Sequence, residues 1–161
     1  MDIHTPRTIW KWMAATVLVH LLVSMIHGAA HAWASVPMSQ AANLFVFVVI
    51  LAGPLIGLGI SFRTRLYGGV VVALTMAASL VFGVVNHFLI DSPDHISHIA
   101  TPWSRLFVTT AVLLTITELL GLAFALRLGP TAHGELTPRA ARDYSGIRIT
   151  AIIMPPFRGT G

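Results

Sequence analysis

The chain has 161 residues, of which 55% are hydrophobic and only 10% are charged. A soluble domain carries about 25% charged residues, so this chain has too few ionised groups to cover a surface that faces water. It contains no cysteine, which excludes disulfides, thiolate metal sites and thiol catalysis. The net charge of +4 does not indicate nucleic-acid binding, because the arginines lie at the ends of apolar segments. We therefore expect a lipid bilayer as the partner, and no nucleic acid.

Four apolar stretches are long enough to cross a bilayer, which takes about 20 residues in a helix. They run from about 9 to 34, 41 to 62, 66 to 90 and 105 to 126, and only the connection at 91–103 is long. We predict an all-α integral membrane protein in which residues 1–128 form a bundle of four transmembrane helices. Residues 129–161 are expected to form a polar cytoplasmic tail, in which 147–154 could be a short strand or dock on a partner.

The positive charges predict the orientation of this bundle, because Arg and Lys concentrate on the cytoplasmic side of a membrane. One side of a four-pass bundle would carry only Arg105, with Asp91 and Asp94 nearby. The other side would carry five basic residues: Arg7, Lys11, Arg63, Arg65 and Arg127. We therefore expect both termini in the cytoplasm, the 91–103 connection outside, and a multi-pass protein of the inner (plasma) membrane.

The first apolar stretch has an alternative interpretation as a secretory signal, with Ala32-Trp33-Ala34 as its cleavage site. Cleavage there would leave three helices. The stretch is longer than a typical signal core and is interrupted by three histidines, so we expect it to stay as the first helix.

Polar side chains follow one face of the first helix: Thr16, His20, Ser24, His27 and His31. At 100° per residue they fall within an arc of about 80°. Lipid would not tolerate such a stripe, so it should face the bundle interior or a water-filled cavity. His27 and His31 are one turn apart, a spacing that lets two imidazoles reach one ion.

A second group of polar residues follows at the same predicted face, where the third helix ends. Ser92-Pro93 is a suitable start for a fresh short helix. Metal ligation is the chemistry that such a convergence of imidazoles and carboxylates favours, with copper, zinc or iron as the ion. The candidate ligands are His27, His31, His87, Asp91, Asp94, His95 and His98.

Glu118 lies deep in the fourth helix, where an ionised carboxylate is costly unless it is paired. At 1.5 Å per residue its depth matches that of His20 on the first helix. We expect these two residues to pair, either as a proton relay toward the metal site or as a structural contact between helices.

Two short motifs resemble those of known metalloenzymes. His27-Gly-Ala-Ala-His31 and His95-Ile-Ser-His98 resemble fragments of the histidine boxes of membrane di-iron desaturases and hydroxylases. The Asp91–His95 spacing is similar to a copper site in the membrane subunits of particulate monooxygenases. The chain lacks the adjacent histidine doublets of the former family, and both resemblances cover a small part of it, so neither assigns a family.

The function that these residues favour is a membrane metalloprotein with its site at the outer face, acting as a metal-dependent oxidoreductase or as a subunit of one. One alternative is metal binding and transport, with an ion passing from His27 by His20 and Glu118. Another is a b-haem electron carrier in which His20 or His27 pairs with His87. The last is a non-catalytic accessory subunit of a membrane complex. Other membrane subunits or further copies of the chain are expected partners.

The predicted orientation can be tested by cysteine labelling in intact cells. A cysteine at Ser92 or Ser97 should react with an impermeant thiol reagent, because the 91–103 connection faces outward. A cysteine at Thr64 should react only after the cells are opened. The opposite pattern would reverse the orientation and leave the number of helices unchanged.

Overall fold

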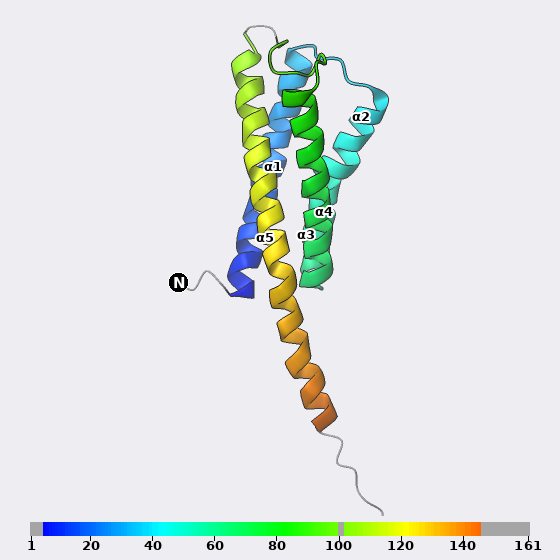
Figure 1. The fold of residues 1–161 in the computed structure, drawn as a ribbon, viewed down its shortest axis with the longest axis vertical. Helices are drawn as coiled ribbons and strands as arrows, with labels where there is room; N and C mark the ends of the chain where they lie inside the picture. Colours follow the sequence, from blue (N-terminus) through cyan, green and yellow to red (C-terminus); the bar gives the residue numbers. More distant parts are fainter. Residues whose placement is uncertain (1–4, 100–101, 146–161) are drawn as a thin grey trace, which may run out of the picture.

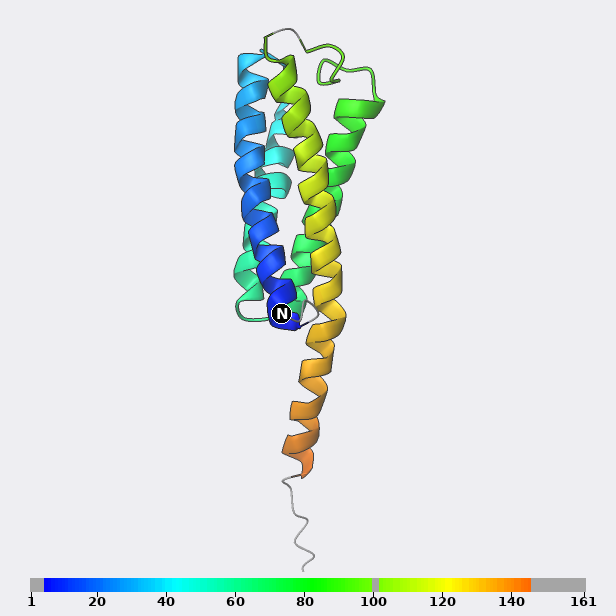
Figure 2. The same ribbon diagram turned by 90° about the vertical axis from the view of Figure 1, so that its left-hand side faces the viewer.

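The computed structural model describes residues 5–99 and 102–145, with their side chains as far as Leu128. The described chain is a bundle of helices in which four spans run up and down side by side (Figures 1 and 2). Two of the spans include π-helical segments, η1 and η2. The elements are α1 (Pro6–Trp33), α2 (Gln40–Phe45), η1 (Val46–Ala52), α3 (Gly53–Ser61), α4 (Arg65–Val84), η2 (Val85–Leu89) and α5 (Ser104–Ser145).

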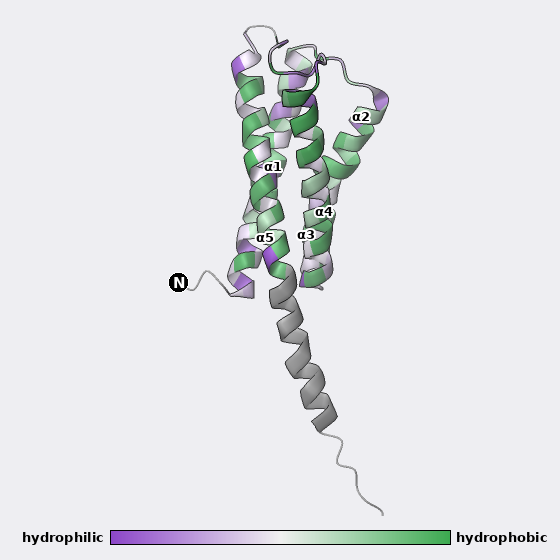
Figure 3. Ribbon diagram, viewed as in Figure 1, coloured by the Kyte–Doolittle hydropathy of each residue, from purple (hydrophilic) through white to green (hydrophobic). Residues whose placement is uncertain are grey.

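Four spans are long and apolar enough to cross a membrane: Pro6–Trp33, Gln40–Ser61, Arg65–Leu89 and Ser104–Leu128. In an 18-residue stretch of each span, between 33% and 39% of the residues are buried, and the others are partly or fully exposed. Many large apolar side chains along the spans are exposed, and Figure 3 shows that the spans are mostly hydrophobic. An apolar exterior around a helical bundle is typical of a multi-pass membrane protein. The predicted all-helical bundle with four such helices is confirmed.

The last helix is longer than expected. α5 continues to Ser145, although the sequence predicted a helix that ends near Leu126. The backbone stays helical across Gly129 and Pro130. A proline inside a helix removes one hydrogen bond and favours a kink, but it does not have to end the helix. The segment 147–154 lies outside the described residues.

The two ends of the bundle carry different side chains. At the end where α1 begins, the Trp10 indole donates a hydrogen bond of 2.8 Å to the Ser61 hydroxyl. At the other end, the rings of Trp33 and Trp103 stack with their centroids 5.0 Å apart. The same end holds the polar cluster described below.

An apolar core fills the bundle on the side of the chain termini. Its members are completely or almost completely buried: Ile9, Met13, Val17, Leu58, Val72, Ala73, Met76, Ala125 and Leu128. Close helix packing supports this core, because a Cβ at Gly68 would overlap the backbone of Ser61. Small residues of this kind let helix backbones approach in a membrane.

The second span changes from π-helix to α-helix at Gly53 and Pro54. Pro54 has no N–H to donate to the carbonyl four residues before it, which is that of Ile50. This carbonyl instead lies 3.3 Å from Nε2 of the buried His20 on α1. At its other end the same span leans outward, and α2 diverges from the rest of the bundle in Figure 1.

Candidate metal centre

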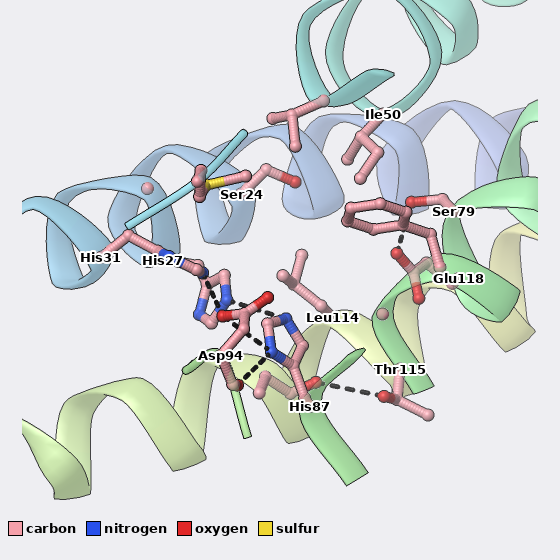
Figure 4. A pocket seen from close by; sticks show the side chains of 16 residues that line it. Ser24, His27, His31, Ile50, Ser79, His87, Asp94, Leu114, Thr115 and Glu118 are labelled. Atoms are coloured by element: carbon pink, nitrogen blue, oxygen red, sulfur yellow. Dashed lines mark hydrogen bonds and ion pairs between the residues drawn. The ribbon is translucent and has the colours of Figure 1, made fainter. Parts of the chain in front are cut away.

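Three histidines meet in the polar half of the bundle. His27 and His31 come from α1, one turn apart, and His87 comes from η2. One nitrogen of each ring lies within 4.8 Å of one nitrogen of each of the others, and all three residues are buried. Figure 4 shows these rings gathered at one side of a cavity. The predicted approach of the α1 histidines to the end of the third span is therefore found.

The tautomer of His27 follows from its partner on α5. Nδ1 of His27 lies 2.8 Å from Oγ1 of Thr110. The Thr110 hydroxyl can donate within its own helix, where Oγ1 lies 2.7 Å from the carbonyl oxygen of Leu106 and 3.0 Å from that of Phe107. With its proton directed at either carbonyl, Thr110 accepts from Nδ1–H of His27, and this arrangement leaves a lone pair on Nε2 of His27.

The same reasoning applies to His87. Its Nδ1 donates to the backbone carbonyl of Asp94 at 3.1 Å, and a carbonyl can only accept. Nε2 of His87 lies 3.2 Å from Nε2 of His27, which is hydrogen-bonding distance, so either a proton on one of these nitrogens or a bound cation can lie between the two rings. Imidazoles that share a tetrahedral zinc ion place their nitrogens about 3–3.5 Å apart, given bonds of about 2.0–2.1 Å.

Asp94 holds the other two imidazoles from the connection that follows η2. Its Oδ1 lies 3.2 Å from Nε2 of His31 and 3.3 Å from Nδ1 of His87. Burial alone would raise the pKa of the Asp94 carboxyl, but the close contact with His87 and the imidazoles of His31 and His27 lower this pKa below its ordinary value. The carboxylate is thus ionised at neutral pH. It lies at ion-pair distance from Nε2 of His31, while Nδ1 of His31 and Oδ1 of Asp94 are both buried without a hydrogen-bond partner among the described residues.

Two α5 residues that the sequence did not point to complete the surroundings of the histidines. Phe107 is fully buried, and its ring centroid lies 4.7 Å from that of His27 and 4.8 Å from that of His31. Thr110 fixes the tautomer of His27, as described above. Both residues lie on the α5 face that also carries Leu114 and Glu118, so helical periodicity taken from Glu118 could have found them.

Three of the seven predicted ligands lie apart from the cluster. His98 Nε2 lies 3.1 Å from Asp91 Oδ1, and the rings of His95 and His98 are 5.6 Å apart. These residues are exposed or half-buried on the surface of the connection. The predicted short helix is not formed, because the described part of this connection consists of turns, in which Ser92 accepts from the Asp94 and His95 amides. The turns direct Asp94 inward and leave Asp91, His95 and His98 outside.

The expected pair of Glu118 and His20 is not formed. Glu118 is 2% exposed and accepts a hydrogen bond of 2.5 Å from the Ser79 hydroxyl on α4. His20 lies 3.3 Å from the hydroxyl of Thr117 and from the Ile50 carbonyl. Thr117 and Glu118 are consecutive residues and therefore point about 100° apart on their helix. The first faces α1, and the second faces α4.

Glu118 lies instead across a small space from His87. A Cβ at Gly83 would lie 3.9 Å from Glu118 Oε2 and 4.0 Å from the His87 ring. The missing side chain at Gly83 leaves this space open. It belongs to a cavity of about 70 Å³ that is bounded by the histidine cluster and Asp94 at one end and by Glu118 at the other (Figure 4). Ile50, Phe82 and Leu114 also line this cavity. A space of this size holds a few water molecules or one small group.

This arrangement offers three imidazole nitrogens, each with its opposite nitrogen directed at an acceptor, beside an open space. Such outer partners orient the rings and raise their basicity as metal ligands. Three protein ligands with a free position are typical of catalytic metal sites, whereas structural sites are closed by a fourth protein ligand. No protein-family model, curated protein or solved structure matches the chain.

The role of Thr110 leads to a prediction about metal affinity. Thr110→Val keeps the shape of the side chain but removes the acceptor for His27 Nδ1–H. Loss of such an outer partner costs about 10-fold to 100-fold in affinity, which competition with a chromophoric chelator would measure. Thr115→Val is the matched control, because the Thr115 hydroxyl is bonded to the Ala111 carbonyl of its own helix. Equal affinities for the two variants would contradict the assignment of the His27 tautomer.

The Glu118 contact predicts the outcome of a double-mutant cycle. Glu118→Leu leaves the buried Ser79 hydroxyl without its partner, which costs about 1–3 kcal/mol. A second change, Ser79→Ala, should recover much of this loss, and Glu118→Gln should be nearly neutral. Unfolding of the protein in detergent would measure these free energies. A coupling free energy between Glu118 and His20, with none between Glu118 and Ser79, would contradict the hydrogen bond described here.

Proposed function

We propose that the protein is a membrane metalloprotein in which His27, His31 and His87 bind one transition metal ion, and that it acts as an oxidoreductase or as a subunit of one. Copper, zinc and iron all suit imidazole ligands, and the redox role requires copper or iron. The single observation that carries the proposal is the convergence of three buried imidazoles, of which one nitrogen each lies within 4.8 Å of the others.

The surroundings of the three histidines support a reactive centre more than a transport site. The cavity beside them leaves room for a small reactant. Beyond the cavity, toward the chain termini, the core consists of apolar side chains such as Met13, Val17, Val72 and Met76. An ion that moved past His20, Thr117 and Glu118 in that direction would meet mainly apolar side chains, at a cost that a membrane interior makes large. This apolar core disfavours passage of the metal through the bundle.

The geometry also disfavours a b-type haem. Two axial imidazole nitrogens on opposite sides of one iron would lie about 4 Å apart, which is twice a metal–nitrogen bond of about 2 Å. The Nε2 atoms of His27 and His87 are closer, at 3.2 Å. A cavity of about 70 Å³ is also far too small for a porphyrin.

We further propose that the site faces the extracytoplasmic side of the inner (plasma) membrane. The support comes from the basic residues Arg7, Lys11 and Arg65, which line one pocket at the end where α1 begins. The histidines lie at the opposite end of the same spans. Under the positive-inside rule the basic end is cytoplasmic. Asp94 and the turns that carry it would then lie at the outer surface.

Metal content of the purified protein tests this function directly. Wild type should bind one ion per chain, measured by elemental mass spectrometry after dialysis. His27→Ala, His31→Ala and His87→Ala should each lose most of this ion, because a two-histidine site is much weaker. The double variant His95→Ala/His98→Ala is the matched control and should keep it. Loss of the ion only in the double variant would place the site in the surface connection.

Spectroscopy of the loaded protein separates the alternatives. Electron paramagnetic resonance should show copper or iron that dithionite reduces and air reoxidises. Stoichiometric zinc would support metal binding without redox chemistry, and a Soret band would overturn the argument against haem. Absence of any metal after expression in supplemented medium would support the accessory-subunit alternative.

A further inference from the structure

A groove on the outside of the bundle leads to the histidine cavity. It lies between α1 and the span formed by α2 and η1, where Figure 1 shows the two helices diverging, and it encloses about 540 Å³. The groove and the cavity share five lining residues: Ser24, Gly28, His31, Met38 and Val46. The two spaces therefore meet beside His31.

The chemistry of the groove is that of a lipid tail. Its outer walls carry Met25, Ala29, Phe47 and Leu51, and no charged side chain lines it within the described part of the chain. On α1 it extends from Ser24 to Ala32, which is about 12 Å at 1.5 Å per residue. Its volume falls within the range of about 300–1,000 Å³ that is typical of small-molecule sites. Because both walls belong to apolar spans, the groove opens toward the bilayer.

We infer that the site takes its substrate sideways from the bilayer, and that this substrate has a linear apolar chain and a small polar head. The chain lies in the groove between α1 and η1, and the head passes Gly28 to reach the histidine cavity. The cavity of about 70 Å³ limits the size of the head, while the groove accepts the chain. This inference rests on the proposed function, because it names the substrate class of the same site.

Gly28 is the residue that controls the junction. It is exposed, and a Cβ at this position would meet no atom within 4 Å. A larger side chain there would fill the opening without a clash within the bundle. Gly59 on α3 has the same properties away from the groove. Gly28→Leu and Gly59→Leu are therefore a matched pair, with the same change in helix propensity and no clash in either case.

The test uses two probes on the full-length protein in detergent, with and without Co²⁺. One is dodecyl hydroxamate with a diazirine in its chain, and the other is acetohydroxamate, which has the same metal-binding head without the chain. The long probe should change the visible Co²⁺ spectrum at a concentration at least about tenfold lower than the short one, because it buries several methylene groups. Photolysis should label the segments 24–32 and 46–51 saturably, with or without Co²⁺.

Gly28→Leu should remove both the saturable labelling and the advantage of the long probe, while the Co²⁺ spectrum without a probe stays as in wild type. Gly59→Leu should change none of these results. Unsaturable labelling of all four spans would mean that the groove holds bulk lipid only and would overturn the inference. If the protein forms a dimer that covers the groove, the probe would not label the groove, and this result would overturn the inference as well.

The two proposals fail in different ways. Saturable, Gly28-dependent labelling without a Co²⁺ spectrum would keep the groove as a binding site and remove the metal centre. A Co²⁺ spectrum with equal potency of the two probes would keep the metal centre and remove the lateral route.

Discussion

The contact between His27 and His87 is the interaction on which the rest of this site depends. Each ring is turned by an acceptor behind it, Thr110 in one case and the Asp94 carbonyl in the other. The two acceptors come from different parts of the chain, and both turn Nε2 of their ring toward the other ring, where the two atoms lie 3.2 Å apart. A proton or a bound metal ion between these two nitrogens would make the contact favourable.

The bundle divides into two halves of opposite character along its axis. One half is a dry core of Met, Val and Leu side chains, and its helices approach so closely at Gly68 that no Cβ fits. The other half holds the histidines, Glu118 and the cavity. In a membrane protein, a buried polar group costs free energy unless it finds a partner. The apolar half stabilises the bundle, and the polar half can therefore keep open space.

Much of the fold and part of the site follow from the sequence. The four spans are visible in the hydrophobicity alone, and the spacing of His27 and His31 placed both rings on the inner face of the first helix. Their approach to His87 followed because both spans end on the same side. Asp94 was among the candidates as well, although its position between two imidazoles depends on turns that spacing does not describe.

The differences between the predicted and the observed positions have physical causes. The candidates Asp91, His95 and His98 were grouped with the others by helical spacing, but the chain after Ile90 forms turns, and that spacing has no meaning there. Glu118 was paired with His20 by depth alone, and depth does not fix rotation about the helix axis. A difference of one residue directs Thr117 to α1 and Glu118 to α4. Thr110 was missed because its role is to orient another side chain.

The π-helical segment η1, Val46–Ala52, has a consequence for how this protein can change in length. A π-helix carries one residue more per hydrogen-bonded turn than an α-helix. Removal of one residue between 46 and 52 would convert this stretch into regular α-helix, and α2 and α3 on either side of it would still form one span. A chain shortened by one residue here would turn α2 by about 100° relative to α3. Such a deletion would therefore change which side chains of α2 line the groove beside the histidines.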